Sequence, residues 1–188
     1  MNTITSRSNV LTEQVERTAH RALLFALGLN REDFARPKIA VVNSWNEIVP
    51  GCIHLRSLSE KVKQGIARSG GIPFEFNTIG ICDGLAQGHL GMHFVLPSRE
   101  IIASSIELML QAHQFDAAVF ISSCDKITPG MLMAAARVNI PSIFLPAGSM
   151  EPGEAGDRKI TLSTMREFAG KHLAGESVSY THLRAHET

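Results

Sequence analysis

The 188-residue chain has few cysteines, no excess charge and no long apolar run, and each absence excludes a class of protein. Its three cysteines include no CxxC pair, and so small and odd a number argues against a disulfide framework. Lys plus Arg and Asp plus Glu each count 18, so neither a nucleic-acid nor a membrane-surface partner is expected. No apolar run approaches a membrane span, and residues 1–9 lack the apolar stretch of a secretory signal. These absences predict a cytoplasmic protein.

The sequence does contain a regular alternation of short apolar runs with segments of helical periodicity. Apolar residues at helical spacing predict helices over about 11–27, 55–66, 97–110 and 129–138. Short runs rich in β-branched and aromatic residues predict strands over about 38–43, 73–81, 116–122 and 141–145. This alternation predicts an α/β fold, a parallel sheet with helices on both faces. Gly, Pro and charge accumulate from about 146 to 159, so we expect the α/β unit to end there.

The residues best suited to chemistry follow the predicted strands. Four segments come directly after the four strands in turn, namely 43–52, 81–91, 123–128 and 146–153. In open α/β sheets the carboxyl ends of parallel strands form the edge where ligands bind. We therefore expect Cys52, Cys82 and Cys124 to lie together at one edge of the sheet, an arrangement that scattered structural thiols seldom show.

The tripeptide Cys124-Asp125-Lys126 places a soft metal ligand beside a hard one. A thiolate suits iron or zinc and a carboxylate suits magnesium, so one turn can hold two different metals near one substrate. Lys126 is either a counter-charge to Asp125 or an amine modified to a metal-binding carbamate. Asp83 offers a second carboxylate after the second strand, and the glycines that follow it let the backbone approach a ligand closely.

Other interpretations of these residues stay open. Each cysteine taken alone fits a small buried hydrophobic residue, and an Asp–Lys pair in a loop is often solvated surface. Segment 82–92 matches neither a dinucleotide fingerprint nor a phosphate loop. His89 and His93 fit either a zinc site or a solvated helix face. Segment 43–55 either caps the next helix or supplies Cys52 as a second thiolate.

From about residue 17 to residue 153 the chain resembles the dihydroxy-acid and phosphogluconate dehydratase family. Motifs in the family's order carry the resemblance: Phe76-Asn-Thr-Ile79, Asp83-Gly84, Leu96-Pro-Ser-Arg-Glu100, Cys124-Asp-Lys-Ile-Thr-Pro-Gly130 and Met131-Leu-Met-Ala134. Segments 97–130 and 137–141 are closer to the dihydroxy-acid branch. The resemblance implies a hydro-lyase that converts 2,3-dihydroxy carboxylic acids to 2-keto acids in branched-chain amino-acid biosynthesis.

The resemblance also implies two cofactors and the residues that bind them. It implies an iron–sulfur cluster, of two or four irons, on Cys124 with Cys52 as a second thiolate. It implies Mg²⁺ on Asp83, Asp125 and a carbamylated Lys126. The implied partners are a small dihydroxy-acid substrate and, for the whole enzyme, a second copy in a homodimer.

The chain departs from the family in two places. It has Cys52 after Pro-Gly, where relatives have Pro-Cys-Asn or Pro-Gly-His. Family members continue for several hundred residues, so we expect 1–177 to be an incomplete N-terminal cluster- and metal-binding domain. Residues 178–188 fit no family segment, and we interpret them as a non-native tail. The family's serine base, another cluster cysteine and a last magnesium ligand lie further on, so we expect this chain to be inactive alone.

Two rival functions stay open at this stage. The first is a dehydratase of the same family that acts on phosphogluconate or a pentonate. The second belongs to another class, a non-enzymatic α/β module with structural zinc on Cys52, His54 and Cys124. The metal content of protein purified without oxygen separates these classes, because zinc without iron or sulfide favours the module.

Overall fold

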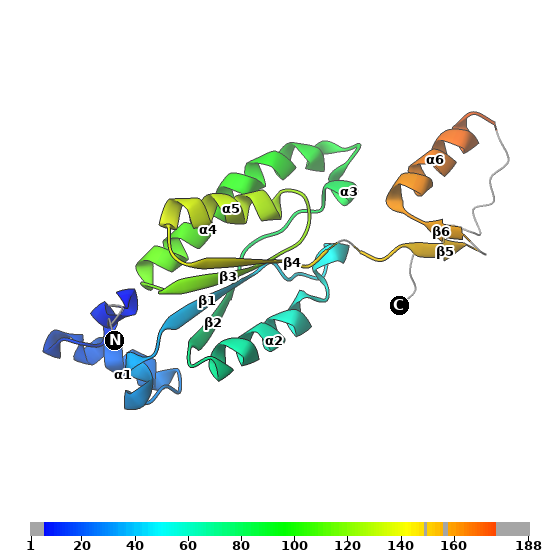
Figure 1. Cartoon of the computed structure of the whole chain (residues 1–188). Coiled ribbons are helices and arrows are strands. Elements are labelled where there is room, and N and C mark those ends of the chain that lie inside the picture. The colour runs from blue at the N-terminus through cyan, green and yellow to red at the C-terminus, as the bar shows by residue number, and fades with distance from the viewer. Residues whose placement is uncertain (1–5, 149, 156–157, 176–188) are drawn as a thin grey trace. The chain divides into compact units, whose positions relative to one another are not determined.

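The computed structural model describes residues 6–148, 150–155 and 158–175, and it divides into two units after Gly148. The first unit contains a parallel sheet in the order β2-β1-β3-β4. Its strands are β1 (Lys38–Asn43), β2 (Ile72–Asn77), β3 (Ala117–Ser122) and β4 (Ser142–Pro146). Figure 1 shows α2 (Leu55–Arg68) on one face, and α4 (Val95–Ala112) with α5 (Ile127–Val138) on the other. The predicted parallel sheet with helices on both faces is confirmed.

The remaining elements are short. The first unit also contains helices α1 (Thr18–Ala26) and α3 (Asp83–Ala86), and 3-10 turns over Arg7–Leu11, Val15–Arg17, Arg31–Ala35, Pro50–Cys52 and Leu90–Phe94. The second unit contains the antiparallel pair β5 (Gly153–Ala155) and β6 (Arg158–Ile160), followed by α6 (Leu162–Leu173). No helix in the described ranges has the length and apolarity needed to cross a bilayer. The tail 178–188 lies outside the described residues, so its interpretation stays a prediction.

The core of the first unit lies on both faces of the two central strands. The fully buried side chains of β1 are Ala40, Val41 and Val42, and those of β3 include Phe120 and Ile121. The ring of Phe120 stacks on that of Phe144 in β4, with centroids 4.7 Å apart. Strands that are buried on both faces appear in a sequence as continuous apolar runs. For this reason β1 and β3 could be predicted well from the sequence.

Helices α4 and α5 pack closely on one face of the sheet. Ile102, Ile106 and Leu110 of α4 are fully buried at helical spacing. At Gly130 of α5 an added Cβ would lie 2.8 Å from a methyl carbon of Ile102, so a side chain there would force the helices apart. Gly130 therefore sets the position of α5, whose N-terminus carries the residues of the candidate site.

Two predicted elements were wrong in extent. The helix predicted over 11–27 begins only at Thr18, because the residues before it form two 3-10 turns. Val15 is 83% exposed and α1 buries none of its side chains, so its apolar periodicity has no core in this unit to stabilise a longer helix. The strand predicted over 73–81 ends at Asn77, where the side-chain amide donates to the carbonyl of Trp45 and the chain leaves the sheet.

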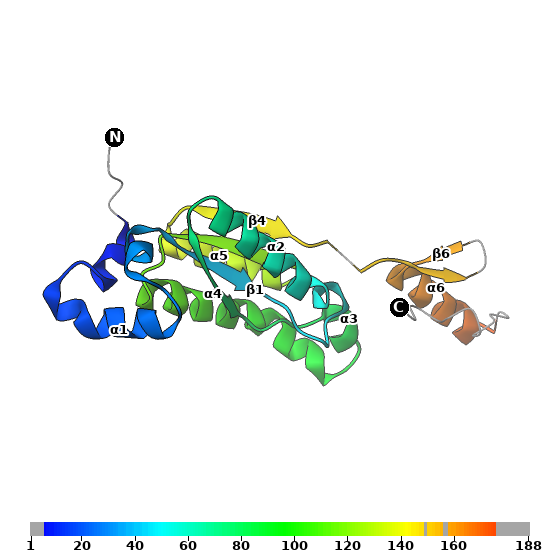
Figure 2. The same ribbon diagram turned by 90° about the horizontal axis from the view of Figure 1, so that it is seen from below.

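The segment before α1 is held to the sheet by one carboxylate. Asp116 accepts hydrogen bonds from the Ser8 amide at 2.9 Å, the Ser8 hydroxyl at 2.7 Å and the Lys38 amide at 2.7 Å. Figure 2 shows this segment and α1 at the end of the sheet opposite α3. Burial alone would raise the pKa of Asp116, but these hydrogen bonds outweigh it and hold that pKa below its ordinary value.

We predict that Asp116→Asn lowers the free energy of unfolding by about 2 kcal/mol at pH 7, because hydrogen bonds to a charged acceptor are lost. A carboxyl whose pKa is depressed by folding stabilises the protein above its unfolded pKa of about 3.9, and that contribution disappears as the pH falls through the folded pKa. Urea denaturation at several pH values checks both points. The partly exposed Glu107→Gln is the control, and a wild-type advantage that stayed constant down to pH 2 would contradict the assignment.

Candidate functional site

Three loops bring the cysteines to the carboxyl edge of the sheet. Cys52 lies in the 3-10 turn after β1, Cys82 precedes α3 after β2, and Cys124 lies between β3 and α5. All three are free thiols that belong to, or pack against, the same hydrophobic core. The sulfur of Cys124 donates a 3.5 Å hydrogen bond to the carbonyl oxygen of Ile81, which joins the loops after β2 and β3. The predicted gathering of the cysteines at one edge is present.

The predicted magnesium ligands also converge, on the ammonium group of Lys126. Its Nζ lies 3.0 Å from Oδ2 of Asp83 and also donates to Oδ2 of the neighbouring Asp125. The structure thus joins Asp83, at the start of α3, to the N-terminus of α5 across 43 positions of sequence. Hydrogen bonding to Asp125 and then to Asp83 raises the pKa of Lys126, and the bond from Lys126 lowers that of Asp125.

One oxygen of this site has no partner. Oδ1 of Asp83 is buried and accepts no hydrogen bond from any residue that the structure describes. A buried carboxylate oxygen rarely lacks a hydrogen-bond partner. Such an oxygen is a suitable ligand for a hard divalent cation. The ammonium of Lys126 stands between two carboxylates, which is where such a cation would be shared.

The site is not a metal-binding group as it stands. Within the described ranges, no three His, Cys, Asp or Glu side chains are grouped so that they could hold a metal ion. The hard donors at this edge are the carboxylates of Asp83 and Asp125, and both are bonded to the ammonium of Lys126. The soft donors at this edge are thiols, the kind of ligand that iron–sulfur clusters take.

The Cys52 turn packs tightly against the loop that carries Cys124. Cys52 is fully buried, and an added Cβ on Gly51 would lie 2.6 Å from the hydroxyl of Ser123. That hydroxyl also donates to the carbonyl of Gly148 at 3.1 Å. The sequence analysis did not identify Ser123. Its only signal was its place beside Cys124, because the contact joins residues that are remote in sequence.

Burial raises the pKa of the Cys124 thiol, although the backbone amides of Asp125 and Asp83 counteract it. Burial likewise raises the pKa of Cys52, against hydrogen bonding to Ser44 and other hydroxyls. The neighbouring Cys124 and Cys82 also raise the pKa of Cys52, and Cys82 raises that of Cys124. With their pKa values raised above the ordinary value for a thiol, both cysteines are protonated at neutral pH.

The histidines do not support the zinc interpretations. His89 accepts a hydrogen bond from the Gly91 amide at 3.0 Å, and its other ring nitrogen lies 2.7 Å from the carbonyl oxygen of Leu85. It caps a 3-10 turn and lies on no helix face. The Nε2 atom of His54 lies 3.2 Å from the carbonyl oxygen of Ala147, and the structure does not group it with Cys52 and Cys124 as a metal site.

Cys124 has a strained backbone. Its φ of 69° lies in the left-handed region, which costs a residue with a Cβ about 1–2 kcal/mol. Strain of this kind concentrates at functional sites, where the surrounding structure enforces it. The conformation directs the chain from the end of β3 into α5, so that Cys124, Asp125 and Lys126 all reach the same edge.

We predict that the variant Cys124→Gly is more stable to urea than Cys124→Ala by about 1 kcal/mol, because glycine relieves the strain and both lack the thiol. Cys82 provides the matched control, since its φ of −91° is ordinary. There the glycine variant should be the less stable of the two. The same order at both positions would show that the backbone of Cys124 is not strained.

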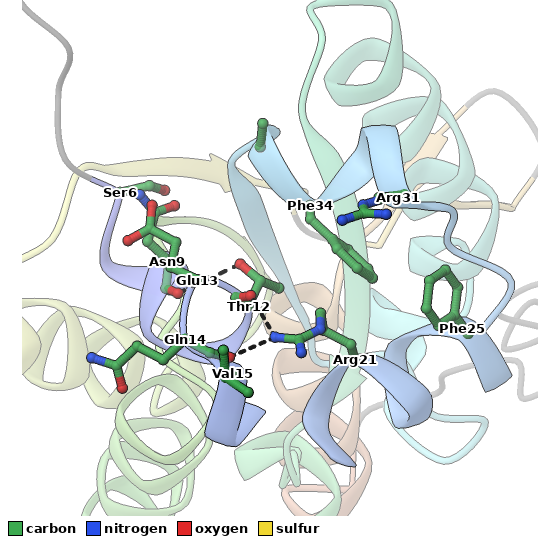
Figure 3. Close-up of a pocket in the computed structure, with 11 residues that line it drawn as sticks. Ser6, Asn9, Thr12, Glu13, Gln14, Val15, Arg21, Phe25, Arg31 and Phe34 are labelled. Atoms are coloured by element: carbon green, nitrogen blue, oxygen red, sulfur yellow. Dashed lines mark hydrogen bonds between the residues drawn. The ribbon is translucent and has the colours of Figure 1, made fainter. Parts of the chain in front are cut away.

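The cavity in Figure 3 belongs to the other end of the sheet. It has a volume of about 910 Å³ and is lined by residues of the N-terminal segment and α1, among them Glu13, Arg21, Phe25, Arg31 and Phe34. Arg21 is already engaged there, with 2.9 and 2.7 Å hydrogen bonds to the carbonyls of residues 12 and 14. No cysteine or histidine lines this cavity, so it is separate from the edge described above.

Comparisons with known proteins agree on one family. The model of the dihydroxy-acid/6-phosphogluconate dehydratase N-terminal region matches residues 36–188. Dihydroxy-acid dehydratase 1 of Methanosarcina acetivorans is 55% identical over 170 residues, 90% of this chain and 31% of the relative. The dihydroxy-acid dehydratase of Pyrococcus furiosus is 52% identical over 178 residues, 95% of this chain and 32% of the relative. The chain thus spans about a third of the length of the curated relatives it matches.

Proposed function

Since the chain belongs to the dihydroxy-acid/6-phosphogluconate dehydratase family, we propose that an enzyme carrying this segment dehydrates 2,3-dihydroxy carboxylic acids to 2-keto acids. It would serve branched-chain amino-acid biosynthesis in the cytoplasm and act as a homodimer. The observation that carries the proposal is the convergence of Asp83 and Asp125 on Lys126 beside the Cys124 thiol. Three relatives at 52–55% identity are each named dihydroxy-acid dehydratase, which favours that substrate class over sugar acids.

The donor set fits both cofactors of the proposal. Asp83 and Asp125 would hold Mg²⁺ together with a carbamylated Lys126, and the buried Oδ1 of Asp83 supplies an oxygen that now lacks a partner. Cys124, with Cys52 as a second thiolate, would hold an iron–sulfur cluster of two or four irons. When bound, the two groups supply Lewis acids for the hydroxyl that leaves C3 and for the oxygens at C1 and C2.

Elimination of water demands such a site. Hydroxide is a poor leaving group, and a proton next to a carboxylate is weakly acidic, so charge must be stabilised at both carbons. Carbamylation would convert Lys126 from a cation that competes for the two carboxylates into an anionic oxygen ligand. Asp83 and Asp125 would orient the substrate through the shared cation. A base must take the C2 proton, and no residue of this chain is assigned to that role.

The proposal can be tested with a hybrid enzyme. Residues 6–175 of this chain replace the matching segment of the Methanosarcina acetivorans relative, and the hybrid is purified without oxygen. We expect keto acid from 2,3-dihydroxy-3-methylbutanoate with kcat/KM within about tenfold of the relative's own. An Asp125→Asn hybrid is the inactive control.

A substrate panel separates the related activities. The hybrid and the relative are compared on the dihydroxy acid, 6-phosphogluconate and a pentonate. An unchanged order of preference supports the dihydroxy-acid assignment. A shift of preference towards either sugar acid would move the segment to the sugar-acid branch, and a folded hybrid that turned over none of the three would contradict the proposal.

A further inference from the structure

The edge of the sheet carries a thiol that the proposed cluster does not use. Cys82 is free and half-buried, and it packs against the same hydrophobic core as Cys124. It immediately precedes α3, at the position where Asp83 begins the helix. Its place in the fold is therefore the same as that of Cys124, at the end of a strand and the start of a helix.

The sequence repeats one dipeptide at these two places. Cys82-Asp83 follows β2 and Cys124-Asp125 follows β3. Both aspartates are bonded to the same ammonium group, that of Lys126. The two cysteines therefore each precede a carboxylate that meets the other at this ammonium group.

Direct contacts place the Cys82 loop against the sulfur of Cys124. The carbonyl oxygen of Ile81 accepts a hydrogen bond from this sulfur at 3.5 Å. The residue before Cys82 therefore touches the Cys124 thiol. A group bound to that thiol would lie beside Cys82.

Adjacent residues of an extended strand point to opposite sides, which argues against Cys82 and Asp83 sharing a site. The structure removes this objection. Cys82 has extended backbone angles, φ −91° and ψ 111°, but Asp83 is the first residue of α3, so the chain turns between them. Asp83 reaches Lys126, while Cys82 packs against the core.

Cys52 is the less accessible thiol. It is fully buried, whereas Cys82 and Cys124 are both half-buried at the edge. An iron that meets a substrate needs ligands that reach this open edge. Exposure therefore favours Cys82 as the thiol that shares the edge with Cys124.

We propose that Cys82 is a thiolate ligand of the iron–sulfur cluster, beside Cys124. The assignment rests on the cluster of the proposed function and puts Cys82 in the place given there to Cys52. With Cys52 bound as well as the family's further cluster cysteine, four thiolates would leave no iron open to the substrate. On binding, the thiol of Cys82 releases its proton to solvent and its sulfur forms a bond to iron, with no electron transferred. Each Cys-Asp pair then bridges the two cofactors, with its sulfur on iron and its carboxylate on magnesium.

The first test compares variants of the full 188-residue chain. Wild type, Cys82→Ser, Cys82→Ala and Cys52→Ser are reconstituted with iron and sulfide without oxygen, and iron, sulfide and visible absorbance are measured after desalting. We expect both Cys82 variants to retain at least about tenfold less iron than wild type. Circular dichroism verifies that they are folded. Wild-type iron content in folded Cys82 variants would overturn the proposal.

The second test leaves the sequence unchanged. The loaded chain is treated with iodoacetamide, and mass spectrometry follows the alkylation of each cysteine before and after the iron is chelated. We expect Cys82 and Cys124 to be protected together and to become reactive together. The proposal for Cys82 would be overturned, and the cluster itself would not, if the loaded chain held iron but Cys82 were alkylated at the same rate before and after chelation. A wild-type chain that retained no iron would contradict the cluster of the proposed function as well.

Discussion

Replacing Cys124 by serine is expected to remove the iron–sulfur cluster almost completely, with iron and sulfide falling to background. A hydroxyl is a poor ligand for the iron of such clusters, and Cys124 is held in place by a left-handed backbone and by the loop after β2. Visible absorbance and iron analysis of the reconstituted protein measure the loss. Ser57→Ala on the exposed side of α2 is the control. Full iron content in Cys124→Ser would remove this residue from the cluster.

The same measurement decides the role of Cys52. As a ligand, it should give a labile or absent cluster when changed to serine. As a core residue, it should give normal iron content with a lower free energy of unfolding, because its thiol is fully buried. Its turn replaces the Pro-Cys-Asn or Pro-Gly-His of relatives, so neither outcome follows from the family alone.

Replacing Asp83 by asparagine is expected to weaken magnesium binding by more than about 100-fold. Changing a residue that only hydrogen-bonds to a metal ligand costs up to about 100-fold in affinity, and loss of a ligand itself should cost more. The amide loses the negative charge and leaves a poorer donor where Oδ1 is now buried without a partner. Titration of Mn²⁺ in bicarbonate buffer, followed by electron paramagnetic resonance, measures the affinity. Asp125→Asn should behave alike.

Glu107→Gln is the matched control for this titration. Glu107 is a partly exposed carboxylate of α4 that pairs with Arg137 of α5 and takes no part in the contacts of Lys126. It should leave the affinity for Mn²⁺ unchanged. Equal affinities in wild type and in Asp83→Asn would show that the two carboxylates serve only to fix Lys126.

The sequence predicted the sheet and the place of the site for one physical reason. The central strands are buried on both faces, so they appear as apolar runs, and the unusual residues follow directly after them. The carboxyl ends of parallel strands meet at one edge of the sheet. Asp83 and Lys126 could therefore be predicted to lie at the same edge, although the sequence gives no sign of their direct contact.

The features that were missed depend on backbone conformation and on remote contacts. The positive φ of Cys124 has no signal in its residue type, since glycine and asparagine are the usual residues there. The shortened α1 reflects an apolar face without a core in its own unit, which periodicity alone could not reveal.

One measurement tests the central claim most directly. The protein is loaded with iron, sulfide, magnesium and bicarbonate without oxygen, crystallised, and examined by anomalous diffraction at the iron absorption edge. We predict an iron peak bonded to Sγ of Cys124, and beside it a cation between Asp83 and Asp125 with a carbamylated Lys126. An iron peak away from Cys124, or carboxylates still bridged by the ammonium of Lys126 in the loaded protein, would contradict the account.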